Sequence, residues 1–201
     1  MRNNLANLDL FFDIEIRDQN GKIIKRSIKR SKSLLRSFAL ALRYAFVLSG
    51  GNITNTVTTK NTAGADASLF SGYANVAWTF IVGCAPIATD TWGIQIGRGT
   101  TPVTKTDYAL VTKCTHGIAT NQFQYGNSSI EEVEGVDPIS KFRMIRIFTN
   151  GSGSSIDINE IGLVISNSGG LFLIARDVFV SPITVPNSST LTIRYIFSVT
   201  A

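Results

Sequence analysis

The sequence predicts a mainly β protein: an antiparallel β-sandwich or jelly roll with an N-terminal β-hairpin and one amphipathic α-helix. Between residues 76 and 201, short apolar runs alternate with clusters of Gly, Pro, Asn and Ser, which is typical of strands joined by turns. Residues 10–16 alternate apolar and polar side chains, the period of a half-buried strand. Helical spacing of apolar residues is confined to residues 33–46.

The composition is that of a chain that folds around a sizeable core. Of its 201 residues, 44% are hydrophobic and 16% are charged, so burial of apolar area can offset the entropy lost on ordering. No apolar run approaches the roughly 20 residues of a bilayer span, so we expect no membrane partner. Acidic residues interrupt the apolar stretch near the N-terminus, where a secretory signal needs a continuous one, so we expect synthesis in the cytoplasm.

The first two strands form the expected hairpin, in one of two registers. Residues 10–16 and 22–28 are the strands, separated by an Asp-Gln-Asn-Gly turn sequence. A two-residue turn would place Ile16 opposite Lys25 and so mix apolar and basic side chains on one face. A three-residue loop pairs Ile16 with Ile24 and keeps the faces separate, so we expect that register.

Next comes a helix of about four turns, which starts near Ser33 and stops at a Ser-Gly-Gly sequence. Its two arginines, Arg36 and Arg43, are sparse compared with membrane-surface helices, so we expect the helix to cover a face or edge of a sheet. The apolar residues that define its period are Leu34, Leu35, Phe38, Leu42, Ala45 and Phe46.

Residues 49–75 are rich in Asn, Thr, Gly, Ser and Ala, which indicates a long loop or an arm that becomes ordered on binding. The chain then divides into residues 1–50 (hairpin and basic helix), 51–75 (arm) and 76–201 (sandwich). The strands expected in the last part are residues 76–82, 92–96, 142–148, 156–165, 171–178 and 191–199.

Positive charge is concentrated near the N-terminus. The chain has 19 Lys and Arg against 14 Asp and Glu, a net charge of +5, yet residues 17–43 hold nine basic residues and a single acidic one. Such a segment can contact an acidic protein surface or, non-specifically, the phosphates of nucleic acid. The candidate contact residues are Lys22, Lys25, Arg26, Lys29, Arg30, Lys32, Arg36 and Arg43.

Motifs for metal or cofactor binding are not recognisable in the sequence. His116 is the single histidine, and with Cys84 and Cys114 it lacks the spacing of a zinc site. We expect both cysteines to be reduced. The Gly97-Arg98-Gly99 sequence lacks the third glycine of a dinucleotide fingerprint, and we interpret its glycines as turn residues.

Two further clusters have structural interpretations. The acidic residues Glu131, Glu132, Glu134 and Asp137 lack the ordered spacing of a calcium loop and are expected to be solvated. Trp78 and Trp92 are the stacking candidates of a glycan-binding module, but both lie in apolar strands, where core packing is favoured. We therefore expect no catalytic residue, no metal, no cofactor and no enzymatic activity.

The chain resembles structural proteins of tailed bacteriophages. The resemblance lies in residues 148–150 (FTN), 156–163 (IDINEIGL), 173–178 (LIARDV), 183–186 (ITVP) and 191–197 (LTIRYIF), and in the earlier segments 18–21 (DQNG), 33–38 (SLLRSF), 96–102 (IGRGTTP) and 108–110 (YAL). It covers most of the chain and implies a β-sandwich building block of the virion that contacts copies of itself and other shell or tail proteins.

Three functions follow as hypotheses. The first is a non-enzymatic virion structural protein (capsid, capsid decoration, neck or tail) that acts by homo-oligomeric assembly. The second is a glycan- or receptor-binding sandwich of a fibre. The third is a capsid protein whose basic N-terminal segment contacts the packaged genome, with binding that weakens steeply with salt.

Overall fold

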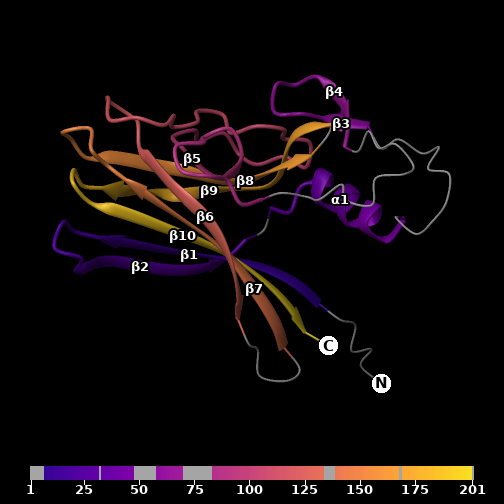
Figure 1. Ribbon diagram of the computed structural model, residues 1–201, viewed down its shortest axis with the longest axis horizontal. Helices are drawn as coiled ribbons and strands as arrows, with labels where there is room; N and C mark the ends of the chain where they lie inside the picture. The colour runs from indigo at the N-terminus through magenta and orange to yellow at the C-terminus, as the bar shows by residue number, and fades with distance from the viewer. Residues whose placement is uncertain are drawn as a thin grey trace.

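The computed structural model describes residues 7–31, 33–47, 58–69, 83–133, 139–167 and 169–200. They form ten strands and one helix, and the two termini of the described chain lie at the same end of the molecule (Figure 1). The elements are β1 (Asn7–Arg17), β2 (Ile23–Arg30), α1 (Arg36–Val47), β3 (Thr58–Lys60), β4 (Asp66–Ser68), β5 (Gly93–Gly97), β6 (Gln124–Val133), β7 (Ile139–Thr149), β8 (Ile156–Asn167), β9 (Gly170–Val185) and β10 (Thr190–Thr200).

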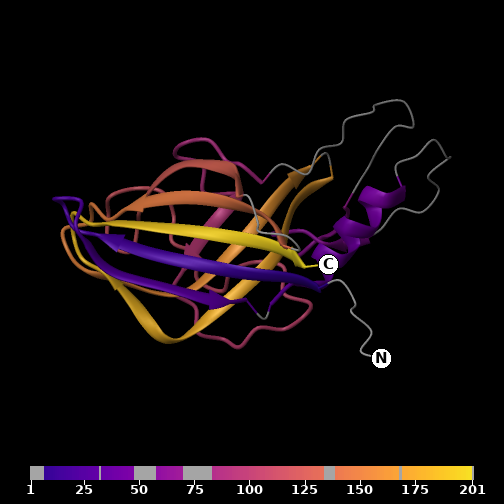
Figure 2. The same cartoon turned by 90° about the horizontal axis from the view of Figure 1, so that it is seen from below.

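The strands form two main antiparallel sheets. The larger sheet has the order β2-β1-β10-β7-β6 and the smaller one the order β5-β8-β9, while β3 and β4 make a separate two-stranded hairpin. The two sheets lie in different layers with their strands crossing, as the view from below shows (Figure 2). The predicted mainly β class is therefore confirmed, and the architecture is consistent with a β-sandwich.

The finer jelly-roll description is not confirmed. In a jelly roll most successive strands lie in opposite sheets. Here β1 and β2, β6 and β7, and β8 and β9 are each hairpins within one sheet. Moreover, β1 pairs with β10 along its whole length, so the N-terminal hairpin is a part of the main sheet and the expected division at residue 50 does not separate two units.

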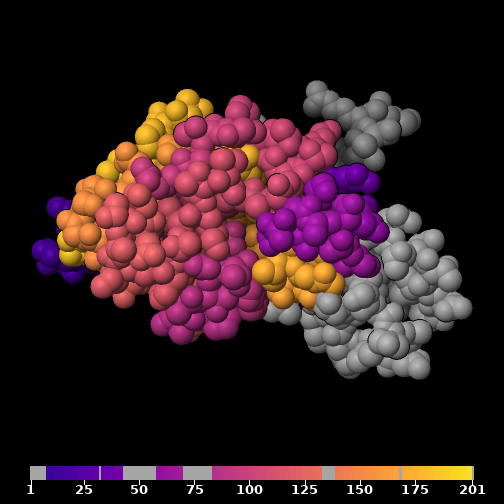
Figure 3. All heavy atoms as spheres, turned by 90° about the horizontal axis from the view of Figure 1, so that it is seen from above, coloured from indigo at the N-terminus to yellow at the C-terminus, as the bar shows by residue number. Residues whose placement is uncertain are grey.

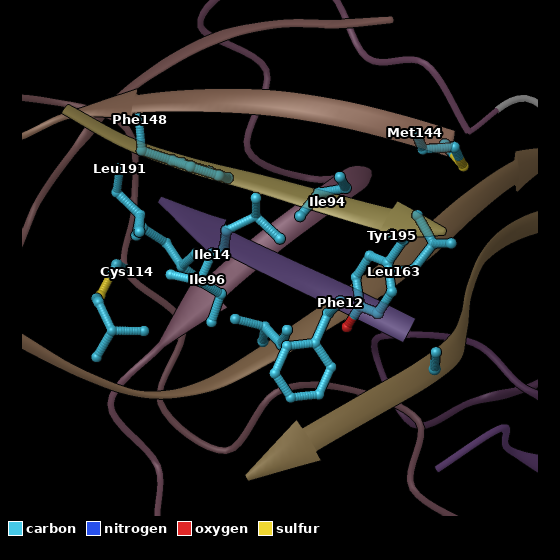
Figure 4. Close-up of a cluster of buried hydrophobic side chains, with 14 of the residues drawn as sticks. Phe12, Ile14, Ile94, Ile96, Cys114, Met144, Phe148, Leu163, Leu191 and Tyr195 are labelled. Carbon is cyan, nitrogen blue, oxygen red and sulfur yellow. The ribbon is translucent and has the colours of Figure 1, made fainter. Parts of the chain in front are cut away.

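The core lies between the two sheets (Figure 4). Alternate residues of β1, Phe12 and Ile14 among them, meet Ile94, Ile96 and Leu163 of the smaller sheet, and all five are at most 4% exposed. The alternation that predicted a half-buried strand at residues 10–16 thus places its apolar side in this core.

The expected three-residue loop is present: the amide of Asp18 donates to the carbonyl oxygen of Lys22, and Gly21 has a positive φ of 79°. Beyond it, a bulge shifts the strands into the register that the sequence argued against. Ile16 lies opposite Lys25 and Glu15 opposite Arg26, with a bulge next to Arg17. Apolar and basic side chains can share a face here because β2 is the last strand of the sheet. Lys25 lies on the same face as the buried side chains of β1, but at the edge, where it is exposed. The observed register instead sets Arg26 across from the carboxylates of β1, where ion pairs form.

Helix α1 begins three residues later than expected, because Leu34 and Leu35 continue along β9. Leu34 forms an isolated bridge with Ala175, and the amide of Leu35 donates to the carbonyl oxygen of Ile174 at 2.9 Å. Phe38 then stacks on Phe197 of β10, with ring centroids 6.3 Å apart. The helix covers an end of the sandwich, as the sequence predicted.

Most strands of the second half are confirmed, and β9 is longer than expected. Strand β6 was not predicted, because Gln124–Val133 has mostly polar residues and no apolar alternation. Residues 58–69 of the predicted arm contain the short β3–β4 hairpin. The strand expected at residues 76–82 lies outside the described residues.

Candidate interaction surface

The basic segment separates into paired and unpaired cations. Arg30 pairs with Asp9, and Arg26 donates to Asp13 at 2.9 Å. Lys22, Lys25, Lys29 and Arg36 are exposed and belong to no ion pair within the part of the chain that the structure describes. Lys32 and the side chain of Arg43 lie outside the described residues. The free charge of this segment is therefore smaller than the sequence indicates.

Paired cations and carboxylates bind β2 to the sheet. Asp13 is 2% exposed because Arg26 covers it from β2 and Arg194 from β10, at 2.9 and 3.4 Å. The hydrogen bond from Arg26 to Asp13 raises the pKa of the guanidinium. These contacts favour the observed register, because a shift of one residue would set Arg26 opposite Ile14 on the other face of the sheet, away from Asp13.

An apolar groove with a volume of about 470 Å³ opens at the end of the sandwich where α1 lies. Phe142 and Phe197 stack in its wall, with ring centroids 4.6 Å apart. Five large apolar side chains on its rim are 40–57% exposed: Leu8, Leu42, Ile130, Phe142 and Val199. A contiguous exposed apolar surface of this kind often marks a site of contact with another molecule.

The segment between β5 and β6 forms much of the face seen from above, as the magenta to salmon atoms show (Figure 3). It is held by Glu160 of β8, whose side chain is fully buried. Each carboxylate oxygen of Glu160 accepts two hydrogen bonds: Oε1 from the amides of Gly99 and Thr112, Oε2 from the amide of Val111 and from Arg176 Nε.

Arg176 of β9 completes this cluster. Its guanidinium donates to Glu160 at 2.8 Å, to Asp107 at 2.7 Å and to the carbonyl oxygen of Thr101 at 2.9 Å. Partial burial alone would raise the pKa of Asp107, but hydrogen bonds from Thr104 and Arg176 outweigh burial and lower it. Glu160, Arg176 and Asp107 bond to one another and to the backbone, and the cluster therefore holds the loops in place.

The Gly-Arg-Gly sequence has a different role from the one predicted. Gly97 is the last residue of β5, and a Cβ at Gly99 would lie 2.4 Å from Glu160 Oε1 and 2.6 Å from the Cβ of Val111. These glycines are therefore required by the close approach of the Glu160 carboxylate, not by a turn. The interpretation as turn residues is wrong for this reason.

A second buried cation, Arg146 of β7, has no ion pair among the described residues. Its five N–H groups donate instead to the carbonyl oxygens of Pro86, Thr89, Trp92, Ile94 and Gly126. The guanidinium also lies 4.8 Å from the centroid of the Tyr125 ring. Burial lowers the pKa of Arg146 to about 10, which still leaves it charged at neutral pH.

His116 serves the same structural purpose. Its Nδ1 accepts a hydrogen bond from the amide of Tyr125, and its own amide donates to Asp90. Partial burial would raise the pKa of Asp90, but hydrogen bonds from His116 and Lys113 outweigh burial and lower it. No group of three or more metal-ligating side chains occurs in the described ranges.

The other sequence candidates lie apart from these clusters. Glu131 and Glu132 are exposed on β6, and Glu131 is paired with Arg143, while Glu134 and Asp137 lie outside the described residues. Trp92 is half-buried and packs beside the buried Leu35, Val164 and Leu173, whereas Trp78 lies outside the described residues.

The cysteines are free, as expected. Burial raises the pKa of the Cys114 thiol from 9.0 to about 11, which reduces its thiolate fraction at pH 8 about 100-fold. We expect iodoacetamide to modify Cys114 in a Cys84→Ser variant at least about 100-fold more slowly in the native state than in urea. The converse variant, Cys114→Ser, keeps the half-buried Cys84 as a faster-reacting control, and equal native and urea rates for Cys114 would contradict its burial.

No described helix is long and apolar enough to cross a membrane. Comparisons of the chain with models of protein families, with curated proteins and with solved structures found no match. The functional argument therefore depends on the residues and surfaces described above.

Proposed function

We propose that this protein is a non-enzymatic structural component of a bacteriophage virion, which assembles with itself and with other shell or tail proteins. The observation that carries the proposal is the apolar groove beside α1. Leu42 of the helix and Phe142 and Val199 of the large sheet are 42–45% exposed there, next to one another. Surfaces of this kind favour burial against another protein.

The buried charge clusters support the same proposal. The segments that resemble phage structural proteins include Glu160, Arg176 and the loop at residues 97–102. The two charged side chains bond to each other and to backbone groups. These segments thus specify a rigid sandwich, while the exposed surface remains available for assembly. Such a division suits a building block better than a catalyst.

The proposal is tested first by the mass of the protein in solution. We expect light scattering to give a discrete oligomer at low and at moderate salt, with a mass that added DNA does not change. The chain is then expected in gradient-purified particles of the phage that encodes it, as detected by mass spectrometry. Absence of the chain from such particles would contradict the virion assignment.

The two other hypotheses predict different results. A genome-contacting capsid protein would bind DNA at low salt and release it as salt rises, because Lys22, Lys25 and Lys29 would exchange counterions with phosphates. A fibre module would bind immobilised glycans and change the fluorescence of Trp92 or Trp78. Deletion of residues 1–50 is unsuitable as a test, since it would remove β1, β2 and α1 and leave β10 without its partner strand β1.

A further inference from the structure

The large sheet ends in two strands of opposite charge. Within the described residues, β2 pairs only with β1 and β6 pairs only with β7. Strand β2 exposes Lys25 and Lys29, and β6 exposes Glu132. None of these three side chains forms an ion pair inside the described part of the chain. Each end of the sheet therefore carries unneutralised charge.

Along its outer side, the backbone of β2 pairs with no other described strand. The amide of Ser31 donates to the carbonyl oxygen of Leu10 on β1, and the direction of peptide groups alternates along a strand. The peptide groups of Arg26, Ile28 and Arg30 therefore point away from β1. Ile28 is 59% exposed, so this edge combines free hydrogen-bonding groups with an apolar side chain.

Among the described residues, nothing pairs with the outer side of β6 over its second half. The amide of Ser128 donates outward to the carbonyl oxygen of Ala85, which closes the first half of this edge. By the same alternation, the peptide groups of Ile130 and Glu132 point outward. Ile130 is 57% exposed. Like β2, this edge has an exposed isoleucine beside peptide groups that bond to no described residue.

At both ends of the sheet, the charged side chains without an ion pair among the described residues lie on the same face. Lys25 and Lys29 lie opposite the buried Ile16 and Phe12, so they are on the face that turns toward the core. Glu132 lies opposite Phe142, which lines the apolar groove on that face. If β2 of one copy lay beside β6 of another, Lys25 and Lys29 would adjoin Glu132.

We propose that β2 of one chain adds to the free half of β6 of a second copy, so that the large sheet continues from subunit to subunit. The inference rests on the proposed self-assembly and identifies its contact. Pairing of β2 with another β2 would bring lysines together and is disfavoured. A head-to-tail contact of this kind closes into a ring when the rotation permits.

The test is a charge exchange between the two edges. In one variant, Lys25→Glu and Lys29→Glu are combined; in the other, Glu132→Lys is made. Each variant alone sets like charges across the contact, so we expect light scattering at moderate salt to give the mass of one chain. Combined in one chain, the three substitutions set opposite charges at every junction for any number of subunits, so the wild-type mass should return.

A control carries the same change in net charge elsewhere: Lys22→Glu with Lys105→Glu, both exposed and outside β2 and β6, should keep the wild-type mass. The proposal is wrong if the wild-type chain is monomeric, if either edge variant keeps the wild-type mass, or if the chain with all three substitutions fails to restore it. Detection of the chain in purified particles decides the virion assignment separately, because a monomer can be found in particles and an oligomer can be missing from them.

Discussion

Replacing Glu160 by glutamine is expected to destabilise the fold by about 3–5 kcal/mol. Glutamine keeps the shape of the side chain but replaces one acceptor oxygen by a donor. Both oxygens of Glu160 accept two N–H groups, so either orientation of the amide opposes its NH2 to two donors. Arg176 also loses its fully buried counter-charge.

This change is measured by urea unfolding, with a fall in Tm on the order of 10 °C as a second readout. Glu131→Gln is the matched control, because Glu131 pairs with Arg143 at an exposed position. Its effect should stay within about 1 kcal/mol. A loss from Glu160→Gln that is no larger than the loss from Glu131→Gln would show that the buried cluster does not stabilise the loops.

The second large effect is expected for Arg146→Lys. Lysine keeps the charge but offers three donors from one atom, whereas the guanidinium supplies five donors in a planar fork to five carbonyl oxygens. At least two buried carbonyl groups lose their donor, so we expect a loss of about 3 kcal/mol in the free energy of unfolding. Urea unfolding measures this loss.

A local readout separates this role from general destabilisation. Arg146 holds residues 85–94 against β6, where the amide of Ala88 donates to Tyr125 and the amide of Ser128 to Ala85. We expect Arg146→Lys to accelerate the hydrogen exchange of the Ala88 and Ser128 amides, relative to the wild type, more than that of the amides in the β8–β9 pair. Arg143→Lys, three residues away and exposed, is the control. Uniformly faster exchange in all strands would contradict a local clamp.

Local patterns were sufficient for most of the secondary structure. The alternation in β1 and the apolar runs of β5, β7, β8 and β10 predicted these strands because burial on one or both faces restricts the residue types there. Strand β6 was not predicted because most of its polar residues are exposed or, like Glu131, pair with Arg143, so it shows no apolar alternation. The register of the hairpin was mispredicted because a strand-pair argument omits Arg194, which lies on β10.

The candidate residues divide in the same way. The charge of the basic segment was evident from composition, but the partners of Arg26 and Arg30 depend on the pairing of β1 with β2. Glu160, Arg176 and Arg146 were missed altogether. Their signal was a charged residue within a largely apolar strand, and such a residue is buried only if another segment supplies its partner.

The sequence by itself determined the class of fold and the helix, because these follow from the period and type of neighbouring residues. The tertiary structure alone decided which strand forms each edge of the large sheet, which cations remain unpaired and why Gly99 must be glycine. The physical reason is that burial and ion pairing depend on residues far apart in the chain, such as Glu160 with Gly99 and Asp13 with Arg194, and local periodicity carries no information about those distances.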